Sequence, residues 1–225
     1  MSRKPYLIGI AGPSGAGKSH LAQAISQRLK APVLELDRYY RDLSHLPMAE
    51  RMLCNFDDPA ALEHELLLGQ VLVLLENNVV AAPAYDFSTH TRSLDSSLFL
   101  PAPCIILEGL FTLHWPKLRE LLDTAVYVDA PEEVCLQRRI ERDVRDRGRT
   151  AESVIEQFRA TVAPMAENYV RPTVTHAQIM VSGELPIDEV ADGVLEHLKR
   201  NSSGSGTDPS RDRHVLHGVT SSVVP

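Results

Sequence analysis

Short apolar runs alternate with stretches in which hydrophobic residues recur every three or four positions along the first 200 residues. The apolar runs predict strands, and the longer spacing predicts helices. The predicted strands cover residues 6–10, 32–37, 104–107, 125–128 and 179–181. The predicted helices cover the positions around Leu21, Ile25 and Leu29, then residues 57–68, 131–145, 151–169 with a kink at Pro164, and 187–199. This alternation indicates an α/β fold, in which crossover helices cover a parallel sheet.

Residues 201–225 differ from the rest of the chain, because they are rich in Ser and Gly and show no helical period. We expect a disordered tail there. A chain of 225 residues is long enough for one α/β domain, or at most two small ones, with a sizeable core. The sequence therefore predicts a domain over residues 1–200, followed by the tail.

Charge and cysteine content argue against several classes of protein. The 23 Lys and Arg residues against 30 Asp and Glu residues give a net charge of −7, which disfavours general binding to nucleic acid or to an anionic membrane. The longest apolar run, residues 98–107, is about half the length that a membrane-spanning helix needs, and two prolines break it. Three widely separated cysteines fit buried thiols in a reducing compartment. We expect a cytoplasmic protein.

The segment Gly12-Pro13-Ser14-Gly15-Ala16-Gly17-Lys18-Ser19 matches the GxxxxGK[ST] pattern between a predicted strand and a predicted helix. Glycines let successive backbone N–H groups turn inward around phosphate oxygens, and the dipole of the following helix favours the same anion. In such a loop Lys18 reaches the β- and γ-phosphates, and the Ser19 hydroxyl is placed to bind Mg²⁺. The pattern predicts nucleotide binding.

Two acids end predicted strands that lie next to this loop. Glu108 follows the strand over 104–107, where a second acid for the Mg²⁺ shell is expected, although a solvated strand end is the alternative. Asp37 ends the second strand and could accept the proton of an attacking hydroxyl. A helix N-cap or a turn is the alternative for Asp37.

Residues 137–149 carry six arginines against three acids, and four of the arginines follow one another at three- or four-residue steps. Guanidinium groups suit phosphoryl oxygens, and Gly148 makes the end of the segment flexible. The pattern predicts a lid over phosphates, with an exposed helix of ion pairs as the alternative.

Five of the eleven Phe and Tyr residues lie between Tyr39 and Phe87. Residues 55–59 and 83–92 interleave these rings with Asp57, Asp86, His90 and Arg92. Aromatic rings with a few polar groups would suit a planar base and a sugar diol. From these residues alone a structural or solvated histidine is favoured for His90, and Asp57 could cap the helix that follows.

Six motifs together resemble those of the uridine–cytidine kinase family, in the same order and spacing over about residues 5–200. They are GPSGAGKS, DxYYR at 37–41, NFDxP at 55–59, YDFxxHxR at 85–92, EG at 108–109 and RRIxRDxxxRGR at 138–149. The resemblance implies a three-layer P-loop NTPase fold of the adenylate-kinase type with an Arg-rich lid. It also implies transfer of the ATP γ-phosphate to the 5′-hydroxyl of uridine or cytidine in pyrimidine salvage, and a homo-oligomer, commonly a tetramer.

The resemblance further implies roles for single residues. Asp37 would be the general base and Lys18 a catalytic residue on the phosphates, while Ser19 and Glu108 would bind Mg²⁺. ATP would be bound by residues 12–19 with Arg142 and Arg147. The implied nucleoside-binding residues are Asp37, Tyr40, Phe56, Asp57, Tyr85, Phe87, His90, Arg139, Arg149 and Gln157.

Two positions depart from the family pattern: Asp58 stands where the family usually has His, and Gln178 where it has Asp. The residues after Val181, which lie near the adenine in the family, also diverge. A related P-loop kinase for a phosphoribulose-type sugar, pantothenate or nicotinamide riboside therefore stays open as an alternative. A GTPase-like switch is a further alternative, although the chain carries no NKxD or DxxG motif.

Overall fold

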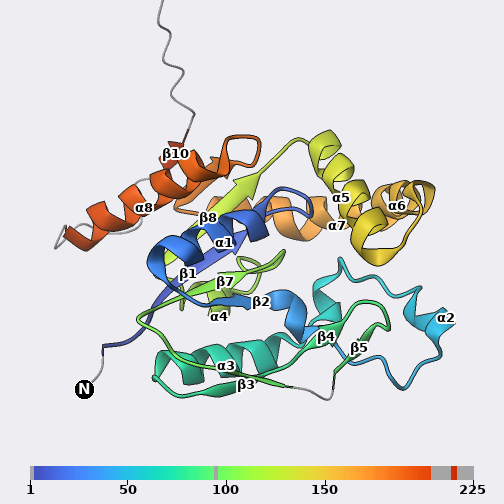
Figure 1. Cartoon of the computed structure of the whole chain (residues 1–225), viewed down its shortest axis with the longest axis horizontal. Helices are drawn as coiled ribbons and strands as arrows, with labels where there is room; N and C mark the ends of the chain where they lie inside the picture. The colour runs from blue at the N-terminus through green and yellow to red at the C-terminus, as the bar shows by residue number, and fades with distance from the viewer. Residues whose placement is uncertain (1–2, 94–95, 204–213, 217–225) are drawn as a thin grey trace, which may run out of the picture.

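Parallel strands form the central sheet, in the order β10-β9-β8-β1-β7-β2 (Figure 1). The computed structural model describes residues 3–93, 96–203 and 214–216. The strands are β1 (Tyr6–Ala11), β2 (Val33–Glu35), β7 (Cys104–Glu108), β8 (Thr124–Asp129), β9 (Ile179–Ser182) and β10 (His214–Leu216). Strand β1 lies between β7 and β8, with Ile8 opposite both Ile106 and Thr124. The segment before the phosphate-binding loop is therefore a central strand.

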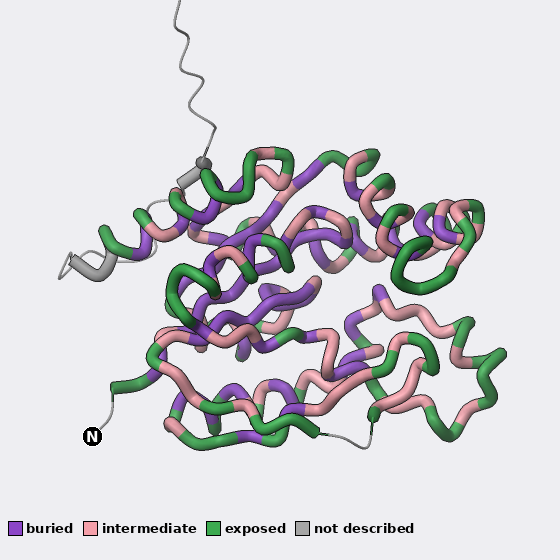
Figure 2. Tube along the Cα trace, in the orientation of Figure 1, coloured by how far each residue is buried: buried purple, intermediate pink, exposed green. Residues whose placement is uncertain are grey.

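The sheet is buried on both faces, which explains its nearly continuous apolar sequence. Successive side chains of β1 point to opposite faces, so Leu7 joins one core and Ile8 the other. Helices α1 (Lys18–Leu29) and α8 (Ile187–Ser203) contribute to the core of Ile8, whereas α3 (His64–Leu75) and α4 (Pro116–Arg119) contribute to the core of Leu7. Figure 2 shows the buried strands between these two layers of helices. The predicted three-layer α/β architecture is confirmed.

A helical arm leaves the carboxyl end of β8 and covers one end of the sheet (Figure 1). It consists of α5 (Glu132–Arg147), α6 (Ala151–Gln157) and α7 (Ala163–Met165). Two π-helical turns, η3 (Phe158–Val162) and η4 (Ala166–Val170), flank α7, and the 3₁₀ turn η5 (Arg171–His176) follows. A proline ring in a helix clashes with the carbonyl four residues earlier, and wider turns relieve that clash. The kink predicted at Pro164 therefore takes the form of π-helical turns.

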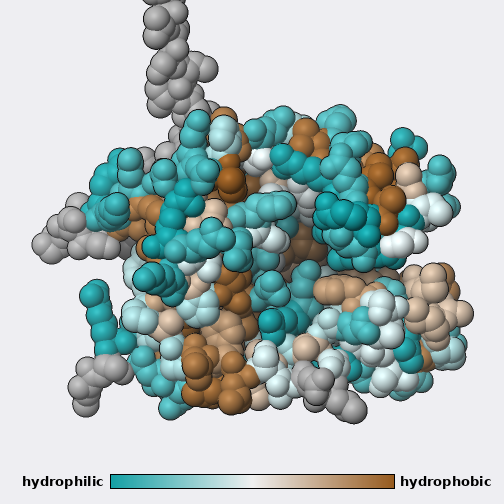
Figure 3. Space-filling model, in the orientation of Figure 1, coloured by the Kyte–Doolittle hydropathy of each residue, from teal (hydrophilic) through white to brown (hydrophobic). Residues whose placement is uncertain are grey.

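Two antiparallel pairs and a short helix lie beyond the β2 edge of the sheet. Strand β3 (Val80–Ala82) pairs with β6 (Ser97–Phe99), and β4 (Tyr85–Asp86) pairs with β5 (Thr91–Arg92). Helix α2 (Met48–Arg51) lies close to the β4–β5 hairpin in Figure 1. These elements face the helical arm, and Figure 3 shows a hollow between the two.

Several boundaries differ from the prediction. The second strand ends at Glu35, and the 3₁₀ turn η1 (Leu36–Tyr39) follows it. The helix predicted over 57–68 is present but begins later than expected. The Asp58 carboxylate accepts a hydrogen bond from Ala60 N at 2.8 Å. This bond caps the 3₁₀ turn η2 (Pro59–Ala61), and the α-helix begins at His64.

The remaining predicted strands and helices are present with boundaries shifted by a few residues. Cys135 is buried, whereas Cys54 and Cys104 are half-buried, so the expectation of three buried thiols is wrong for two of them. No helix in the described part of the chain combines the length and apolar character needed to cross a bilayer. The prediction of a disordered tail is wrong for residues 214–216, because they form β10 and pair with β9. Residues 204–213 and 217–225 of the predicted tail lie outside the described residues.

Candidate active site

The loop between β1 and α1 requires glycine at its turning points. Gly12, Gly15 and Gly17 have φ values of 145°, 84° and 108°, which disfavour any residue with a Cβ. A Cβ on Gly12 would also lie 2.1 Å from the carbonyl oxygen of Val128. The buried Lys18 ammonium donates to the carbonyl of Pro13 at 3.0 Å, so the lysine lies along the loop. Burial lowers the pKa of Lys18, and the carboxylates of Glu108 and Asp37 oppose that shift.

Glu108 ends β7 next to the loop, opposite Ile10 of β1. Its carboxylate is buried beside the Ser19 side chain, so it is not a solvated strand end. Burial raises the pKa of Glu108 to about 7, while the nearby Lys18 acts to lower it. A serine hydroxyl beside a carboxylate supplies the oxygen ligands that Mg²⁺ prefers, and it leaves further positions for water and phosphate. The pair fits a magnesium site.

Asp37 lies on η1, just past the carboxyl end of β2. It is not an N-cap, since Glu35 occupies that position of η1. Burial raises the pKa of the Asp37 carboxyl group, and the positive charges of Lys18, Arg147 and Arg142 oppose this. The carboxylate therefore faces both the loop lysine and the arginines of α5.

Aromatic rings from three segments form one cluster beside Asp37. Tyr40 lies 5.4 Å from Phe56 and 5.3 Å from Tyr85 between ring centroids, and Phe87 lies 5.2 Å from Tyr85. His90 stacks on Phe56 at 4.8 Å with an interplanar angle of 17°. The predicted aromatic residues are thus brought together.

The polar atoms of this cluster point to a ligand rather than to a satisfied core. Within the described residues, the buried hydroxyl of Tyr85 and the buried Nδ1 of His90 have no hydrogen-bond partner. His90 also has a φ of 54°, a conformation that non-glycine residues seldom adopt outside functional sites and turns. Burial and the charges of Arg147 and Arg149 lower the pKa of His90, which favours the neutral imidazole.

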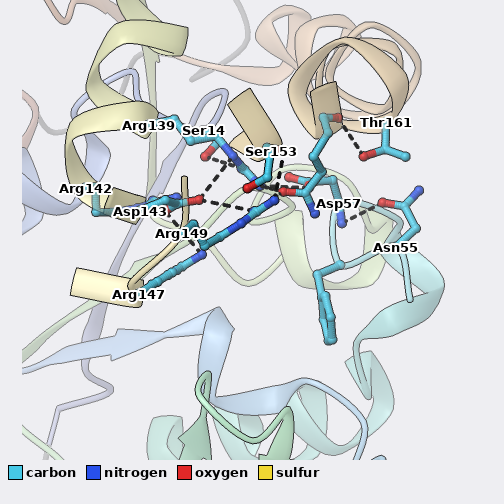
Figure 4. A network of polar contacts seen from close by, with 12 residues as sticks. Ser14, Asn55, Asp57, Arg139, Arg142, Asp143, Arg147, Arg149, Ser153 and Thr161 are labelled. Atoms are coloured by element: carbon cyan, nitrogen blue, oxygen red, sulfur yellow. Dashed lines mark hydrogen bonds and ion pairs between the residues drawn. The ribbon is translucent and has the colours of Figure 1, made fainter. Parts of the chain in front are cut away.

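Arg139 connects three parts of the site (Figure 4). Its guanidinium donates to Ser14 Oγ at 2.9 Å and lies 3.5 Å from the carboxylate of Asp57. Gln157 Oε1 accepts hydrogen bonds from Arg139, at 3.2 Å, and from Arg149. The phosphate-binding loop, the 55–59 segment and α6 therefore share one polar network. Because Asp58 is the cap and Asp57 pairs with Arg139, the helix-cap alternative for Asp57 is excluded.

Four arginines surround the carboxylate of Asp143, which is 0% exposed. Arg142 Nε lies 2.8 Å from Oδ1, and nitrogens of Arg147, Arg139 and Arg149 lie 3.5, 3.7 and 3.7 Å from the carboxylate. The guanidinium carbon of Arg147 also lies 4.9 Å from the centre of the Phe87 ring. The arm therefore reaches the aromatic cluster, as a lid would.

The alternative of an ion-paired helix holds for part of α5. Arg145 and Asp146 form an ion pair at 2.7 Å with both side chains well exposed. The segment therefore combines a solvated outer face with a buried arginine cluster.

Two polar residues outside the aromatic cluster have structural roles. Asp86 accepts hydrogen bonds from the N–H of Ser88 at 2.8 Å and from its hydroxyl at 2.6 Å, in the turn between β4 and β5. Arg92 forms an ion pair with Glu63 at 2.9 Å. The Asp86 carboxylate is therefore used in the turn and the Arg92 guanidinium in an ion pair, rather than in the aromatic cluster as the interleaved pattern had indicated.

The two departures from the family pattern also have structural explanations. Asp58 is the cap of η2. Gln178 Oε1 accepts from Ala125 N at 2.6 Å, at the amino ends of the strands. The phosphate-binding loop follows the carboxyl end of β1, so Gln178 lies at the opposite end of the strands.

Sequence reasoning missed Arg138, which it grouped with the other basic residues. Arg138 donates to the carbonyl of Gly183 at 2.9 Å and to those of Ala16 and Gly15 at 3.3 and 3.4 Å. These bonds join the phosphate-binding loop to the connection between β9 and α8. A pocket of about 180 Å³ lies beside them, lined by Gly17, His20, Leu21, Val128, Arg138, Ser182, Gly183, Leu185, Ile187 and Val190. The available signal was the place of Arg138 at the start of the basic run over residues 137–149.

The family model described as Phosphoribulokinase / Uridine kinase family matches residues 7–190. The chain belongs to this family. A uridine kinase of Shewanella sp. (strain W3-18-1) is 43% identical over 187 residues, covering 80% of this chain and 88% of the relative. Membership predicted from the six motifs is thus confirmed.

Solved structures support the fold of this family member. A protein of Bacillus stearothermophilus described as a possible uridine kinase has a TM-score of 0.56 at 19% identity, covering 80% of this chain and 90% of the other. Phosphoribulokinase from Rhodobacter spheroides has a TM-score of 0.59 at 18% identity, covering 78% and 69%. At these identities the likeness concerns the fold alone, and it confirms the predicted P-loop kinase architecture.

Proposed function

We propose that this chain transfers the γ-phosphate of ATP to the 5′-hydroxyl of uridine or cytidine, as in pyrimidine salvage. One observation carries the proposal: the Asp37 carboxylate is close enough to act to raise the pKa of both Lys18, in the phosphate-binding loop, and Tyr40, in the aromatic cluster. Relatives named uridine kinase, at 43% identity over most of their length, support this acceptor over other small alcohols. The protein is a phosphotransferase that acts on an alcohol group.

ATP would lie along the loop of residues 12–19. The backbone N–H groups and Lys18 would bind the phosphates, with Arg142 and Arg147 above them. The pocket beside Gly17 and Gly183 has mainly apolar walls and would accept the adenine. Ser19 and Glu108 would hold Mg²⁺, which when bound neutralises charge on the β- and γ-phosphate oxygens.

The nucleoside would occupy the cluster beside Asp37. The Asp37 carboxylate would accept the proton of the 5′-hydroxyl as that oxygen attacks the γ-phosphorus. Asp57, oriented by Arg139, would accept hydrogen bonds from the ribose 2′- and 3′-hydroxyls. Tyr85 and His90 would bond the base edge, since both carry an unused polar atom. Further contacts to the nucleoside would come from Tyr40, Phe56, Phe87, Arg149 and Gln157.

A panel of acceptors tests this proposal. Pure protein with Mg·ATP is given uridine, cytidine, purine nucleosides, pantothenate, nicotinamide riboside and ribulose 5-phosphate, and the products are identified by mass spectrometry. We expect uridine and cytidine 5′-monophosphates at the highest kcat/KM. Transfer to none of the nucleosides would reject the proposal. Tight GTP binding without transfer to any acceptor would instead support a nucleotide switch.

We also propose that the chain forms a homo-oligomer in the cytoplasm. Exposed apolar side chains gather over α3 and the β3–β6 pair, where Figure 3 shows a hydrophobic patch. They are Leu66, Leu72, Val73, Val79, Leu98 and Leu100. Patches of this kind commonly mark protein–protein contacts. The three free thiols support a reducing compartment.

A further inference from the structure

Asp143 is a buried charge that the proposed chemistry does not use. Its side chain is 0% exposed, and it lies one helical turn after Arg139 and one before Arg147 on α5. Burying a carboxylate is costly unless cations and hydrogen bonds compensate. Here the compensation comes from four guanidinium groups, those of Arg139, Arg142, Arg147 and Arg149. The cluster thus places several positive charges around one acid.

The bonding inside the cluster is incomplete. Arg142 makes a hydrogen bond to Oδ1 at 2.8 Å, whereas the other three contacts, at 3.5 to 3.7 Å, exceed hydrogen-bond distance. Among the described residues, Asp143 Oδ2 and Arg139 Nε have no hydrogen-bond partner. The carboxylate therefore gathers the arginines mainly by charge. The terminal nitrogens of Arg139 and Arg149 are bonded elsewhere, to Ser14, Gln157 and the Ser153 carbonyl.

The backbone of Asp143 contributes as well. Gly148 ends α5 in the left-handed conformation, with a φ of 62°, and its N–H donates to the carbonyl of Asp143. The N–H of Arg149 donates to the same carbonyl at 3.1 Å. This turn brings Arg149 back beside the carboxylate, which the helix itself could not do.

Two of the four arginines also contact other parts of the site. Arg139 donates to Ser14 of the phosphate-binding loop, and Arg147 lies over Phe87. Burial and the charge of Arg142 lower the pKa of Arg147, which shows that the guanidinium groups repel one another. Without a central anion that repulsion would drive the four side chains apart.

We propose that Asp143 is a positioning residue that holds these four arginines together, so that Arg142 and Arg147 are preassembled as a clamp for the transferred phosphoryl group. The inference rests on the proposed kinase function. Arginines fixed before the reaction stabilise developing charge without reorganising during it. Asp143 thereby acts through the arginines and touches neither substrate.

Two substitutions separate charge from shape. Asp143→Asn keeps the shape and removes the charge, whereas Asp143→Glu keeps the charge in a longer side chain. Asp146→Asn, on the outer face of the same helix, is the matched control, because its partner Arg145 is exposed. Thermal unfolding of each variant gives its folded fraction, to which all rates are normalised.

Steady-state kinetics with uridine give the first readout. Asp143→Asn should lower kcat by roughly 10- to 100-fold, the loss typical of misplaced catalytic groups, with a much smaller change in the KM for ATP. Asp143→Glu should retain more of kcat than Asp143→Asn, and Asp146→Asn should match the wild type. A kcat for Asp143→Asn within about twofold of the wild type would overturn the proposal. A higher kcat for Asp143→Asn than for Asp143→Glu would also overturn it. Failure of both variants to fold would assign Asp143 to stability and would also overturn it.

Hydrogen exchange over residues 142–149, followed by mass spectrometry with and without Mg·ATP, gives a readout that needs no phosphoryl transfer. A preassembled clamp predicts slow exchange in the free wild type and little change with Mg·ATP. Asp143→Asn should exchange faster when free and regain protection with Mg·ATP. Equal exchange in the two free proteins would reject the clamp. An inactive wild type with the expected exchange pattern would reject the kinase function alone.

Discussion

At the scale of single residues, neighbouring side chains of the same type have different roles because of what surrounds them. Asp57 and Asp58 are adjacent carboxylates, yet Asp58 caps a 3₁₀ turn while Asp57 is buried against Arg139. Glu35 is the last residue of β2 and is exposed. Asp37 follows two residues later, and the charge of Lys18 opposes the rise in the pKa of its carboxyl group. Composition and spacing identify the candidates, but the partners of Asp57 and Asp37 come from distant segments.

Asp37→Asn tests the general base. It should lower kcat by roughly 10²- to 10⁴-fold, the usual contribution of general-base catalysis, while uridine and Mg·ATP still bind. Burial raises the pKa of Asp37. As the pH is lowered, wild-type kcat/KM should therefore begin to fall while the pH is still above the ordinary aspartate pKa of about 4. The sign follows from the base acting as a carboxylate, which protonation removes as the pH falls.

The residual rate of Asp37→Asn should lack this acid limb, so subtracting the two profiles isolates Asp37 from other titrating groups. Calorimetric titration with each substrate controls for binding. Turnover equal to that of the wild type would place the base elsewhere.

At the scale of elements, hydrophobic periodicity predicts the long helices and the strands of the main sheet other than β10, because these elements depend on apolar side chains that recur within one segment. It does not predict β4 and β5, which are two-residue strands. The hairpin they form depends on the Asp86–Ser88 turn and on the aromatic cluster. The π-helical turns beside Pro164 and the helix start at His64 likewise depend on local hydrogen bonds, which periodicity does not report.

Gly148→Ala tests the turn that ends the lid helix. A Cβ at Gly148 would meet nothing within 4 Å, so the substitution changes only the cost of its left-handed conformation. The left-handed conformation costs a residue with a Cβ about 1–2 kcal/mol. We therefore expect the free energy of unfolding to fall by about 1 kcal/mol. We also expect kcat to fall several-fold, because Arg149 would shift.

Gly69→Ala in α3 is the matched control, since a Cβ there also meets nothing within 4 Å. In a helix interior this change should stabilise by up to about 1 kcal/mol without altering kcat. Denaturant unfolding and initial rates measure both effects. The same sign of stability change in both variants would contradict this account of Gly148.

At the scale of the whole molecule, the site exists because topology brings distant segments to one end of the sheet. The loop at 12–19, Asp37 and Glu108 follow the carboxyl ends of adjacent parallel strands, so their proximity can be predicted from the sequence. The approach of Arg139 to Asp57, or of Arg147 to Phe87, requires the arm and the β4–β5 hairpin to face each other across the hollow in Figure 3. Motif resemblance assigns these residues to one site but does not predict the pairs, and composition and periodicity do neither.

Leu98→Lys tests assembly. Leu98 is 74% exposed on β6, and a lysine there should shift the protein to smaller species if the apolar face lies between copies. Light scattering after size-exclusion chromatography gives the mass. Leu53→Lys, at an exposed position after α2, is the control and should leave the mass unchanged. A monomeric wild type would reject the proposed oligomer.

The central claim is that Asp57 and the aromatic cluster form a ribonucleoside site beside the phosphate-binding loop. The ratio of kcat/KM for uridine to kcat/KM for 2′-deoxyuridine tests this claim most directly. A site built to bond hydroxyls discriminates strongly against analogues that lack them. The wild type should therefore have a much higher kcat/KM for uridine than for 2′-deoxyuridine. Asp57→Ala should reduce this ratio, because kcat/KM falls most for uridine. His90→Ala should lower kcat/KM for both nucleosides and leave the ratio unchanged. A ratio that stays at the wild-type value in Asp57→Ala would contradict the account.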